Sequence, residues 1–437
     1  MLRFAPSPTG DMHIGNLRVA ILNYIIAKQA GEEFLIRIED TDNARNIEGK
    51  DKEILGILNL FGLFWDRLVY QSDNFKQHNI IANELIKKGK AFYCYCTKDF
   101  LSQKKDEAIK NGIAFRYDDS WAEICKDINP NPTIRLKGAE DSIIFIDEIK
   151  GECKFNKNEI DSFVIIRDDL TPTYNFACSA DDMLYDISYI IRGEDHTSNT
   201  PKQILVRQYI GYLKDIKYAH LPIILNKDGK KMSKRECESS VKWLLEQGYL
   251  PNAILNYLLS MGNKPKNEIF TLKEAILWFD MKNLSKSPVK FDIDQLRYIN
   301  REHLKRLSPK DMAFLLESND LSIGALGKIY LEEASTLNEI RDKIDLIFKP
   351  KSLDKENAES QAQMQYLRDV ILELVKQNDE CLGDFNAFKT RLSEICKLNG
   401  KALFYPLRFL LTGSHKGPLL NELYPYLRFY LKEILRS

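Results

Sequence analysis

Arg3-Phe-Ala-Pro-Ser-Pro-Thr-Gly-Asp-Met-His-Ile-Gly-Asn16 is the stretch around which the rest of the chain is organised. A short apolar run over residues 2–5 leads into a loop with two prolines, and a helical pattern follows the loop. The entrance of that helix carries His13, Gly15 and Asn16. Backbone N–H groups and the helix dipole at such an entrance attract phosphate, and an imidazole can donate to a phosphate oxygen. A nucleotide site is one interpretation of this loop, and an ordinary connection between a strand and a helix is the other.

Length and composition place the chain among globular proteins. Its 437 residues are enough for three or four domains of ordinary size, and 44% hydrophobic with 29% charged residues is typical of folded, water-soluble chains. We find no apolar run long enough to cross a bilayer and no leader pattern, so we expect a cytoplasmic protein without a membrane partner. The eight cysteines are scattered, which favours reduced thiols over a secreted disulfide framework.

Basic and acidic residues are equal in number, at 63 each, but unevenly distributed. Residues 282–310 hold eight basic against three acidic residues, and residues 387–437 hold nine against three. A neutral total can conceal a basic face for a nucleic acid, although solvated helix surfaces have the same composition. Rings alternate with basic residues near the C-terminus, and exposed members of this set could stack unpaired bases: Phe404, Tyr405, Arg408, Phe409, His415, Lys416, Tyr424, Tyr426, Arg428 and Phe429.

A second β-prone run, Phe34-Leu-Ile-Arg-Ile-Glu-Asp-Thr-Asp42, follows the first helix and ends in acids. Strand, helix and strand in this order predict a parallel crossover, and open parallel sheets bind ligands beyond the carboxyl ends of their strands. The loop at 6–13 and the acids Glu39, Asp40 and Asp42 should then lie on the same rim. Glu39 could hold an ammonium group or a ribose hydroxyl there, or these acids could simply cap the next helix.

The whole pattern predicts an α/β fold: a Rossmann-type parallel sheet, an inserted α+β domain, and an all-α C-terminal region. Residues 89–171 change to short strands, turn residues and charged connections, which is why we interpret them as the insertion. The sheet is expected to resume at Pro172-Thr-Tyr-Asn-Phe176 and to continue through strands at 187–191 and 220–225. From residue 240 onward, apolar residues recur at helical spacing.

A cationic loop follows the last of these strands. Its sequence, Asn226-Lys-Asp-Gly-Lys-Lys-Met-Ser-Lys-Arg235, contains four lysines and one arginine beside glycine and small polar residues. A mobile cationic loop beside a phosphate site can close over a triphosphate and neutralise the charge that develops during transfer. Without the first motif, the same loop would be interpreted as a solvated basic turn.

His13-Ile-Gly-Asn16 and Lys231-Met-Ser-Lys-Arg235, taken together, resemble the two signature motifs of class I aminoacyl-tRNA synthetases. Further segments are similar to bacterial-type glutamyl-tRNA synthetases: residues 3–10, 37–42 with Arg45, 172–176 and 191–196. The resemblance runs through the catalytic half and, more weakly, through the helical remainder. Asn16 departs from the glycine or threonine that is usual at the end of the first signature.

The resemblance implies ATP-dependent ligation of L-glutamate to tRNA through glutamyl-adenylate, with release of pyrophosphate and AMP. Magnesium is implied with the ATP phosphates. The implied glutamate contacts are Arg3, Ala5, Ser7, Glu39, Tyr174 and Arg192. The implied ATP contacts are His13, Gly15, Asn16, Glu194, His196, Lys231, Ser233 and Lys234. Of these, His13, Lys231 and Lys234 are the candidate catalytic residues, because they can stabilise charge on the phosphoryl group in the transition state.

The resemblance also implies a division of labour along the chain. Residues 1–88 and 172–238 would form the two halves of the Rossmann catalytic domain, and residues 89–171 the inserted acceptor-stem-binding domain. Residues 239–310 would contact the tRNA stem, and residues 311–437 would form the helical anticodon-binding region. We expect a monomer that binds tRNA and has no DNA partner.

Many members of this family carry zinc in the inserted domain, on a Cys-x-Cys pair followed 24 residues later by two further ligands. Here Cys94-Tyr-Cys96 is present, but Trp121 and Glu123 stand at the later positions. Structural zinc requires four ligands, mostly nitrogen or sulfur, and Cys125 is out of register. The sequence therefore disfavours zinc and predicts no metal site.

Other functions fit parts of the sequence. A tRNA-independent relative that glutamylates a modified nucleoside would lack the long helical region, and a eukaryotic-type glutaminyl enzyme would carry a β-barrel there. A catalytically silent RNA-binding paralogue would not need His13, Glu39 and Arg192 intact. Residues 11–16 and the eroded zinc motif resemble the second glutamyl copy of bacteria that charge tRNA-Gln with glutamate. Both tRNA-Glu and tRNA-Gln are therefore candidate acceptors.

Overall fold

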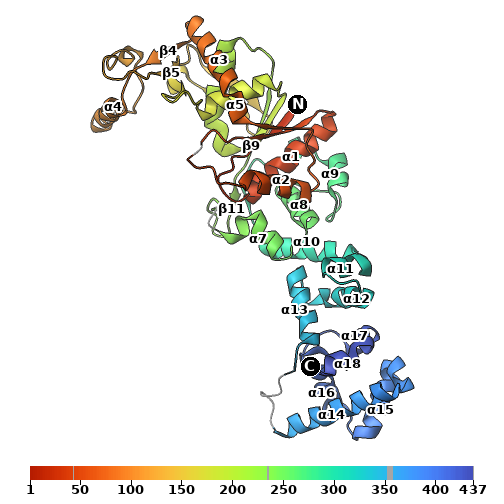
Figure 1. Cartoon of the computed structure of the whole chain (residues 1–437). Helices are drawn as coiled ribbons and strands as arrows, with labels where there is room; N and C mark the ends of the chain where they lie inside the picture. The colour runs from red at the N-terminus through yellow and green to blue at the C-terminus, as the bar shows by residue number, and fades with distance from the viewer. Residues whose placement is uncertain (43, 234–235, 352–357, 437) are drawn as a thin grey trace. The chain divides into compact units, whose positions relative to one another are not determined.

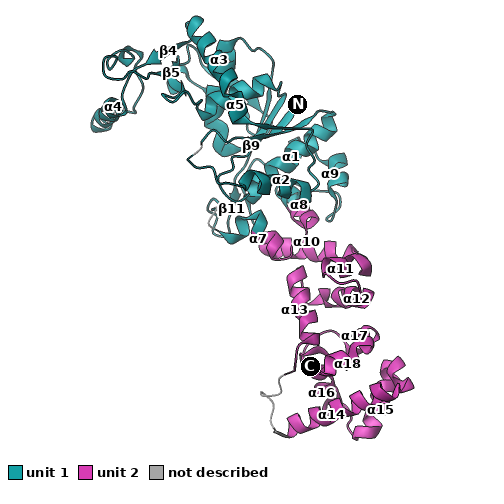
Figure 2. Cartoon of the chain, in the orientation of Figure 1, with its two compact units in different colours: residues 1–242, 258–292 teal, residues 243–257, 293–437 magenta. Residues whose placement is uncertain are grey.

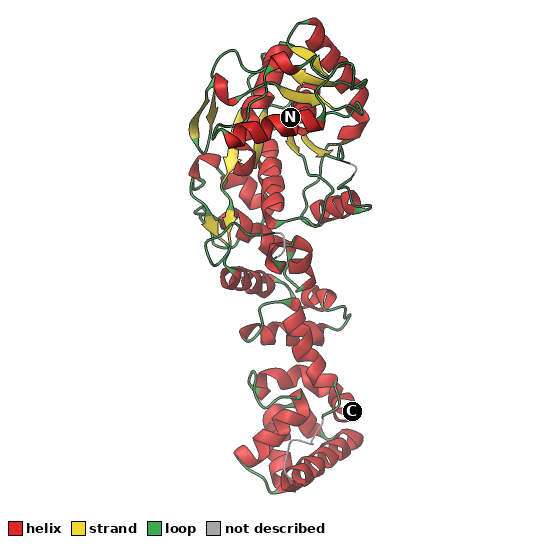
Figure 3. Cartoon of the chain, turned by 90° about the vertical axis from the view of Figure 1, so that its left-hand side faces the viewer, coloured by secondary structure: helices red, strands yellow, loops and turns green. Residues whose placement is uncertain are grey.

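The computed structural model describes the chain except for residues 43, 234–235, 352–357 and 437. It divides into two compact units, residues 1–242 with 258–292 and residues 243–257 with 293–437 (Figure 2). The described strands all belong to the first unit, and the regular structure described in the second is helical (Figure 3). The predicted α/β fold with an all-α C-terminal region is thereby confirmed. Among the described helices, none is long and apolar enough to cross a membrane.

The first unit is built on a seven-stranded sheet (Figure 1). Its strands lie in the order β3 (Arg67–Tyr70), β2 (Phe34–Ile38), β1 (Leu2–Phe4), β9 (Tyr189–Gly193), β10 (Lys217–Leu221), β6 (Ile143–Asp147) and β7 (Gly151–Phe155). All neighbours pair in parallel except β6 and β7. Every side chain of β2 is buried, as expected for a central strand with both faces covered. The predicted strand, helix and strand unit is confirmed.

The first connection, α1 (Ile14–Ala30), begins and ends for local chemical reasons. At its start, the Nδ1 atom of His13 accepts a hydrogen bond from the backbone N–H of Gly15, at 3.0 Å. At its end, Gly31 adopts φ 65 in the left-handed region, and its N–H reaches the carbonyls of Ala27 and Lys28. The helix contacts both β1 and β9, so its N-terminus is fixed beside the carboxyl ends of these two strands.

The strand order reverses at β1. From β1 the chain proceeds to β2 and β3 on one side, and it returns much later to β9 and β10 on the other side. Such a switch point leaves a crevice at the carboxyl ends of the two central strands, because their connections leave in opposite directions. The loop after β1 and the segment after β9 therefore meet at one place.

The insertion differs from the prediction in one respect. Strands β4 (Ala91–Cys94), β5 (Thr133–Leu136) and β8 (Phe163–Ile166) form a separate antiparallel sheet, but the hairpin β6–β7 between them joins the seven-stranded sheet. Ile143, Phe145 and Asp147 are buried while Ile144 and Ile146 are exposed. Phe145 packs with side chains of the main sheet, and this alternation determines where the hairpin lies. The range 89–171 is therefore not a single spatial body.

Two predicted strands are wrong. Residues 172–176 do not resume the sheet: Pro172 forms an isolated bridge, and α5 (Tyr174–Leu184) begins two residues later. Phe176, Ala177 and Ala180 are buried at helical spacing, which outweighs the β-prone Thr-Tyr pair. The predicted strand at 220–225 is two strands, because Pro222 has no N–H to donate between β10 and β11 (Ile224–Leu225). β11 pairs with β12 (Val289–Lys290) instead.

The other α-helices that include residues of the first unit are α2 (Lys50–Leu60), α3 (Phe75–Lys87), α4 (Lys98–Lys110), α6 (Thr200–Ile210), α7 (Val241–Glu246), α8 (Pro251–Ser260) and α9 (Leu272–Trp278). Two boundaries between the units fall within α7 and α8, because residues 243–257 belong to the second unit. Between β9 and α6, the 3-10 helix η4 (Glu194–Asn199) follows directly on β9, so its side chains lie beside the crevice.

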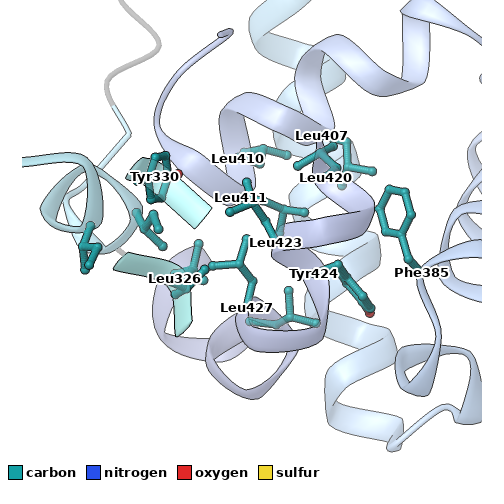
Figure 4. Close-up of a cluster of buried hydrophobic side chains, with 14 of the residues drawn as sticks. Leu326, Tyr330, Phe385, Leu407, Leu410, Leu411, Leu420, Leu423, Tyr424 and Leu427 are labelled. Atoms are coloured by element: carbon teal, nitrogen blue, oxygen red, sulfur yellow. The ribbon is translucent and has the colours of Figure 1, made fainter. Parts of the chain in front are cut away.

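The second unit continues as α10 (Ile293–Arg306), α11 (Pro309–Leu315), α12 (Leu321–Ile329), α13 (Leu337–Phe348), α14 (Ala358–Gln377), α15 (Phe385–Cys396), α16 (Lys401–Thr412), α17 (Leu420–Leu427) and α18 (Leu431–Arg436). A leucine-rich cluster joins these helices, and Figure 4 shows Leu407, Leu411, Leu423 and Leu427 at its centre. Helical spacing of these apolar residues explains why the all-α prediction holds.

Candidate active site

A pocket of about 380 Å³ opens at the switch point of the sheet. Its walls come from the loop after β1, the start of α1, the end of β2, α5, β9 with η4, and residues 221–232. Most of the residues predicted from sequence line it: Arg3, Ala5, Ser7, His13, Gly15, Asn16, Glu39, Tyr174, Arg192, His196 and Lys231. Glu194 and Ser233 are not among its lining residues, and Lys234 lies outside the described residues.

The wall of the pocket at the start of α1 has the donors and the helix dipole that favour an anion. Because the Nδ1 atom of His13 accepts from the N–H of Gly15, the proton of the neutral ring lies on Nε2, where it can be donated to a ligand. A Cβ atom at position 15 would lie 3.2 Å from that Nδ1 atom, so glycine permits this close contact. The arrangement combines an imidazole donor with the positive end of the α1 dipole.

A buried ion network lies beneath the strand side of the pocket. Asp182 on α5 accepts from Arg3 Nε at 3.2 Å and from Arg37 Nη1 at 2.7 Å. Burial alone would raise the pKa of Asp182, but the two guanidinium groups lower it to about 2. Arg37 is fully buried, and its neighbouring carboxylates hold its pKa well above the usual value against the effect of burial. Arg3 is thereby fixed at the pocket wall.

Glu39 is held by the same network. Arg37 Nη2 donates to its Oε1 atom at 3.1 Å, and the Cys178 thiol donates to the same oxygen at 2.9 Å. Burial and the charge of Glu39 raise the pKa of Cys178 well above its usual value, so this thiol stays protonated and remains a donor. Both contacts use one oxygen, and among the described residues none is hydrogen-bonded to the other, Oε2. That oxygen is available to a ligand cation.

Arg192 is a buried cation with neutral partners. Its Nε donates to His220 Nε2 at 3.2 Å and its Nη2 to Thr200 Oγ1 at 2.7 Å. Of the residues that the structure describes, none places a carboxylate oxygen within 4 Å of this guanidinium. Burial and the nearby charge of Arg3 lower the pKa of Arg192, although Tyr174 acts in the opposite direction. A carboxylate entering the pocket would relieve this excess of positive charge.

Tyr174 and His196 form the wall between these two sides. The Tyr174 hydroxyl lies 3.0 Å from His196 Nδ1, and the two ring centroids are 5.7 Å apart. Burial and the charge of Arg192 lower the pKa of His196 to about 4, so the ring is neutral at pH 7. Burial raises the pKa of Tyr174 well above its usual value. Neither ring adds charge to the pocket, whose ionic character comes from its arginines, Glu39, Asp195 and Lys231.

Comparison with known proteins shows which family the chain belongs to. Residues 1–298 match the family described as "tRNA synthetases class I (E and Q), catalytic domain", and residues 295–427 match an "Anticodon binding domain". Glutamate–tRNA ligase 2 of Wolinella succinogenes is 59% identical over 436 residues, which cover 100% of this chain and 99% of that protein. The chain belongs to the glutamate–tRNA ligase family. The resemblance that the two loops indicated is confirmed, and with it ATP-dependent ligation of glutamate to tRNA.

Further relatives agree with this membership of the glutamate–tRNA ligase family. A Helicobacter pylori protein named GlutamylGlutaminyl-tRNA synthetase is 51% identical over 439 residues, which cover 100% of this chain and 99% of the relative. The crystal structure of a glutamate tRNA ligase from Elizabethkingia meningosepticum in complex with its amino acid has a TM-score of 0.81 and 25% identity, and the match covers 100% of this chain and 99% of that chain. The silent-paralogue and nucleoside-modifying alternatives gain no support from these matches.

Two predicted ATP contacts of the ligase fold have other partners in this structure. Glu194 forms an ion pair with Lys150 and accepts from the backbone N–H of Ile223 at 2.9 Å. Lys231 Nζ lies 3.3 Å from Asp195 Oδ2, and both side chains are more than half exposed. Glu194 therefore acts on the backbone that leads into the cationic loop, whereas Lys231 is at the pocket itself.

The insertion of this ligase does not present a zinc ligand set. Cys94 Sγ lies 3.1 Å from the Tyr117 hydroxyl, and Cys96 Sγ donates to the Trp121 carbonyl at 3.2 Å. Burial raises the pKa of the Cys96 thiol to about 11 in these surroundings, so its sulfur acts as a protonated donor there. No group of three or more His, Cys, Asp or Glu residues within the described part of the chain is placed to hold a metal ion. These cysteines pack with aromatic side chains instead.

Sequence reasoning missed the residues behind the pocket wall of this ligase. In the sequence, Arg37 has no role beyond its place in the family-like segment 37–42, Cys178 is one scattered cysteine, and His220 marks the start of a predicted strand. Nothing in the sequence indicates a partner for Asp182. One signal was present: a charged residue between the isoleucines of β2 must be buried, and it must therefore be paired.

Proposed function

We propose that this pocket is where the chain forms glutamyl-adenylate, with glutamate on the side of Arg3, Glu39 and Arg192 and ATP on the side of the α1 entrance. The observation that carries the assignment is that the pocket has a buried cation, Arg192, and a carboxylate oxygen of Glu39 that can receive a cation. Arg192 needs an anion, and the Oε2 atom of Glu39 can take a cation. Glutamate offers a side-chain carboxylate and an α-ammonium group, so it satisfies both at once.

In this proposal the glutamate half comprises six residues. Arg192 pairs with the side-chain carboxylate, since a guanidinium can bind a carboxylate through two donors. Glu39 takes the α-ammonium group. Arg3 is held by Asp182 at the pocket wall, where it adds positive charge near the carboxylates of the substrate. Ala5, Ser7 and Tyr174 complete the pocket around the glutamate chain.

The ATP half lies at the start of α1. His13 donates from Nε2 to a phosphate, and Gly15 and Asn16 offer the helix entrance to the same anion. His196 and Lys231 line the opposite wall, while Ser233 and Lys234 are assigned on the resemblance of the loop to the second signature motif. Glu194 contributes through the backbone of residue 223. Magnesium would enter together with ATP and would neutralise part of the negative charge of its phosphates.

The reaction then proceeds in two steps. An oxygen of the glutamate α-carboxylate attacks the α-phosphorus of ATP, and the bond to the leaving pyrophosphate breaks. The negative charge on the phosphoryl oxygens grows near His13 and Lys231, which stabilise it without taking part in a covalent step. In the second step the 2′-hydroxyl of the terminal tRNA ribose attacks the activated carbonyl, and AMP leaves.

We propose that the tRNA binds along the rest of the chain. The protein would bind it as a monomer, in the cytoplasm. The sheet β4-β5-β8 and its surroundings in residues 89–171 would contact the acceptor end, residues 239–310 the stem, and residues 311–437 the anticodon. Tyr405 supports the last assignment, because it is 51% exposed and its ring stacks on His415 with centroids 3.9 Å apart. The substitution Tyr405→Ala should lower the rate of tRNA aminoacylation and leave the KM for glutamate unchanged.

We propose tRNA-Gln as an acceptor beside tRNA-Glu. The names of the Wolinella and Helicobacter relatives, ligase 2 and GlutamylGlutaminyl-tRNA synthetase, support a second-copy role. Aminoacylation of purified tRNA-Glu and tRNA-Gln, measured side by side with [14C]glutamate, tests it. Charging of tRNA-Glu alone would disprove the second-copy role while leaving the adenylate pocket intact.

Two substitutions test the division of the pocket. His13→Ala should lower the rate of ATP–pyrophosphate exchange, measured with tRNA present, while the KM for glutamate changes little. Arg192→Ala should raise the KM for glutamate with a smaller effect on the KM for ATP. The same defect in both variants would show that the two sides of the pocket are not separate.

A further inference from the structure

His220 on β10 lies behind the pocket wall, and its ring is bonded at both nitrogens. It is fully buried. Its Nδ1 atom lies 2.6 Å from Asp147 Oδ2. Its Nε2 atom lies 3.2 Å from Arg192 Nε and 3.0 Å from Thr200 Oγ1. Neither His220 nor Asp147 is a pocket-lining residue, so neither contacts a ligand directly.

These contacts determine which nitrogen of His220 carries the proton. The Nε–H of an arginine always donates, so the Nε2 atom facing it must accept. The ring proton is then on Nδ1, where it is donated to Asp147. Asp147 is itself an anchored acceptor: its Oδ1 receives the backbone N–H groups of Ile149 and Lys150 at 2.9 and 2.8 Å.

The same tautomer orients Arg192 through a second route. Arg192 Nη2 donates to Thr200 Oγ1 at 2.7 Å, and that oxygen lies 3.0 Å from His220 Nε2 and 3.4 Å from the His196 carbonyl oxygen, either of which can accept the hydroxyl proton of Thr200. The neutral imidazole thus holds Arg192 Nε directly, and Thr200 beside it holds Nη2. A protonated imidazole would present a donor to both the Arg192 Nε and the Thr200 hydroxyl, and two cations would face one another.

We propose that Asp147 and His220 are positioning residues: the aspartate holds the imidazole in its Nδ1–H form, and the imidazole holds the Arg192 guanidinium in the orientation that receives the substrate's side-chain carboxylate. This inference rests on the proposed role of Arg192. It assigns a function to the hairpin β6–β7, because that hairpin brings Asp147 from the middle of the insertion to a position beside β10.

Replacing one nitrogen function at a time tests the proposal. In His220→Gln, an amide oxygen can replace Nε2 as the acceptor for Arg192, while the link to Asp147 is lost. In His220→Asn, an amide group replaces Nδ1, while the acceptor for Arg192 is lost. We expect His220→Asn to raise the KM for glutamate roughly 10- to 100-fold, since small displacements of a binding group have effects of that size. The KM for ATP should change less than about threefold, and His220→Gln should recover most of the loss.

Asp147→Asn tests the aspartate without a substitution on β10, although Asp147 Oδ2 also accepts from the backbone N–H of His220 at 3.0 Å. Its amide can donate to Nδ1, which moves the ring proton to Nε2 and turns that atom into a donor facing Arg192. The KM for glutamate should therefore rise although the side chain keeps its size. Tyr218→Phe is the matched control, because Tyr218 is a buried residue of the same strand and bonds to Arg207 instead. It should leave the KM for glutamate unchanged.

The results separate the two proposals. If Arg192→Ala leaves the KM for glutamate unchanged, the assigned role of Arg192 is wrong. If Arg192→Ala damages glutamate recognition but His220→Asn and His220→Gln behave alike, or raise both KM values equally, only the positioning role is overturned. Should His220→Asn fail to fold, an unchanged KM for glutamate in Asp147→Asn would overturn the positioning role.

Discussion

Asp182→Asn is the substitution for which the structure allows the most detailed prediction. Asp182 is completely buried and links Arg3 to Arg37, while Arg37 in turn holds Glu39. Asparagine has nearly the same shape but no charge. The change therefore leaves the packing of α5 intact and removes the negative charge that balances two guanidinium groups. We expect a lower free energy of unfolding for the sheet and a higher KM for glutamate.

The size of the loss follows from the pKa of Asp182. Its fall from 3.8 to about 2 corresponds to roughly 2.5 kcal/mol of stability at pH 7. Removing one partner of a buried ion pair costs about 3–5 kcal/mol in other proteins, so we predict a loss of about 3 kcal/mol. Because folding lowers this pKa, the contribution is complete above about pH 4 and disappears as the pH falls through 2.

Hydrogen exchange followed by mass spectrometry is the appropriate assay. The chain has two compact units that need not unfold together, so a single melting temperature would mix their contributions. Peptides that cover β1 and β2 report the local free energy directly. Asp186→Asn is the control, because Asp186 is exposed, pairs with Lys214, and adopts φ 53, which asparagine also tolerates.

The control should change the local free energy by less than about 0.5 kcal/mol. Asp182→Asn should also raise the KM for glutamate, because Arg3 and Glu39 lose their common support. An Asp182→Asn protein whose β1 and β2 exchange no faster than those of Asp186→Asn would refute the view that this network stabilises the sheet.

Three further predictions concern the rest of the first unit. Burial and Arg192 lower the pKa of His196 to about 4, so between pH 6.5 and 4 the unfolded chain binds a proton that the folded chain does not. The free energy of unfolding should therefore decrease as the pH is lowered from 6.5 to 4. His196→Gln should make this pH dependence, measured by urea titration, less steep. Lys231→Ala should slow ATP–pyrophosphate exchange at least tenfold with no change in melting temperature, since its pair with Asp195 is exposed, and a lower melting temperature would contradict this. EDTA should not shift the melting temperature, because Tyr117 and its ring neighbours fill the space around the cysteine pair; a drop of several degrees would reveal a structural metal.

The sequence was informative wherever local pattern and chemistry coincide. The apolar run at 34–38 predicted a buried strand, and the structure has one there. The helix entrance at His13, for which a nucleotide site was one interpretation, lies at the pocket. The loop at 6–13 and Glu39 are far apart in the chain, yet the sequence predicts that they share a rim because both follow strands of one parallel crossover, and both line the pocket. Family resemblance supplied the choice of glutamate and ATP, which loop chemistry alone left open.

Tertiary partners were not predictable in the same way. The segment at 172–176 contains β-prone residues, but α5 begins at Tyr174, and Phe176 and Ala180 pack in one cluster with side chains of α3 and α6. Glu39 was correctly placed on the rim, but nothing adjacent in sequence indicates that a thiol 139 positions away would donate to it. Asp147 carries no local signal at all, since its role depends on which sheet its hairpin joins.

The position of β1 between β2 and β9 has a consequence for folding during synthesis. On the ribosome β1 acquires its first neighbour early, but its second neighbour begins at Tyr189. At roughly 5–20 residues per second, one edge of the nascent β1–β2 pair waits about 8–30 seconds for β9. During that time an apolar strand edge is open to pairing with other chains. We therefore expect newly made protein to depend on chaperones mainly in the first half of its synthesis.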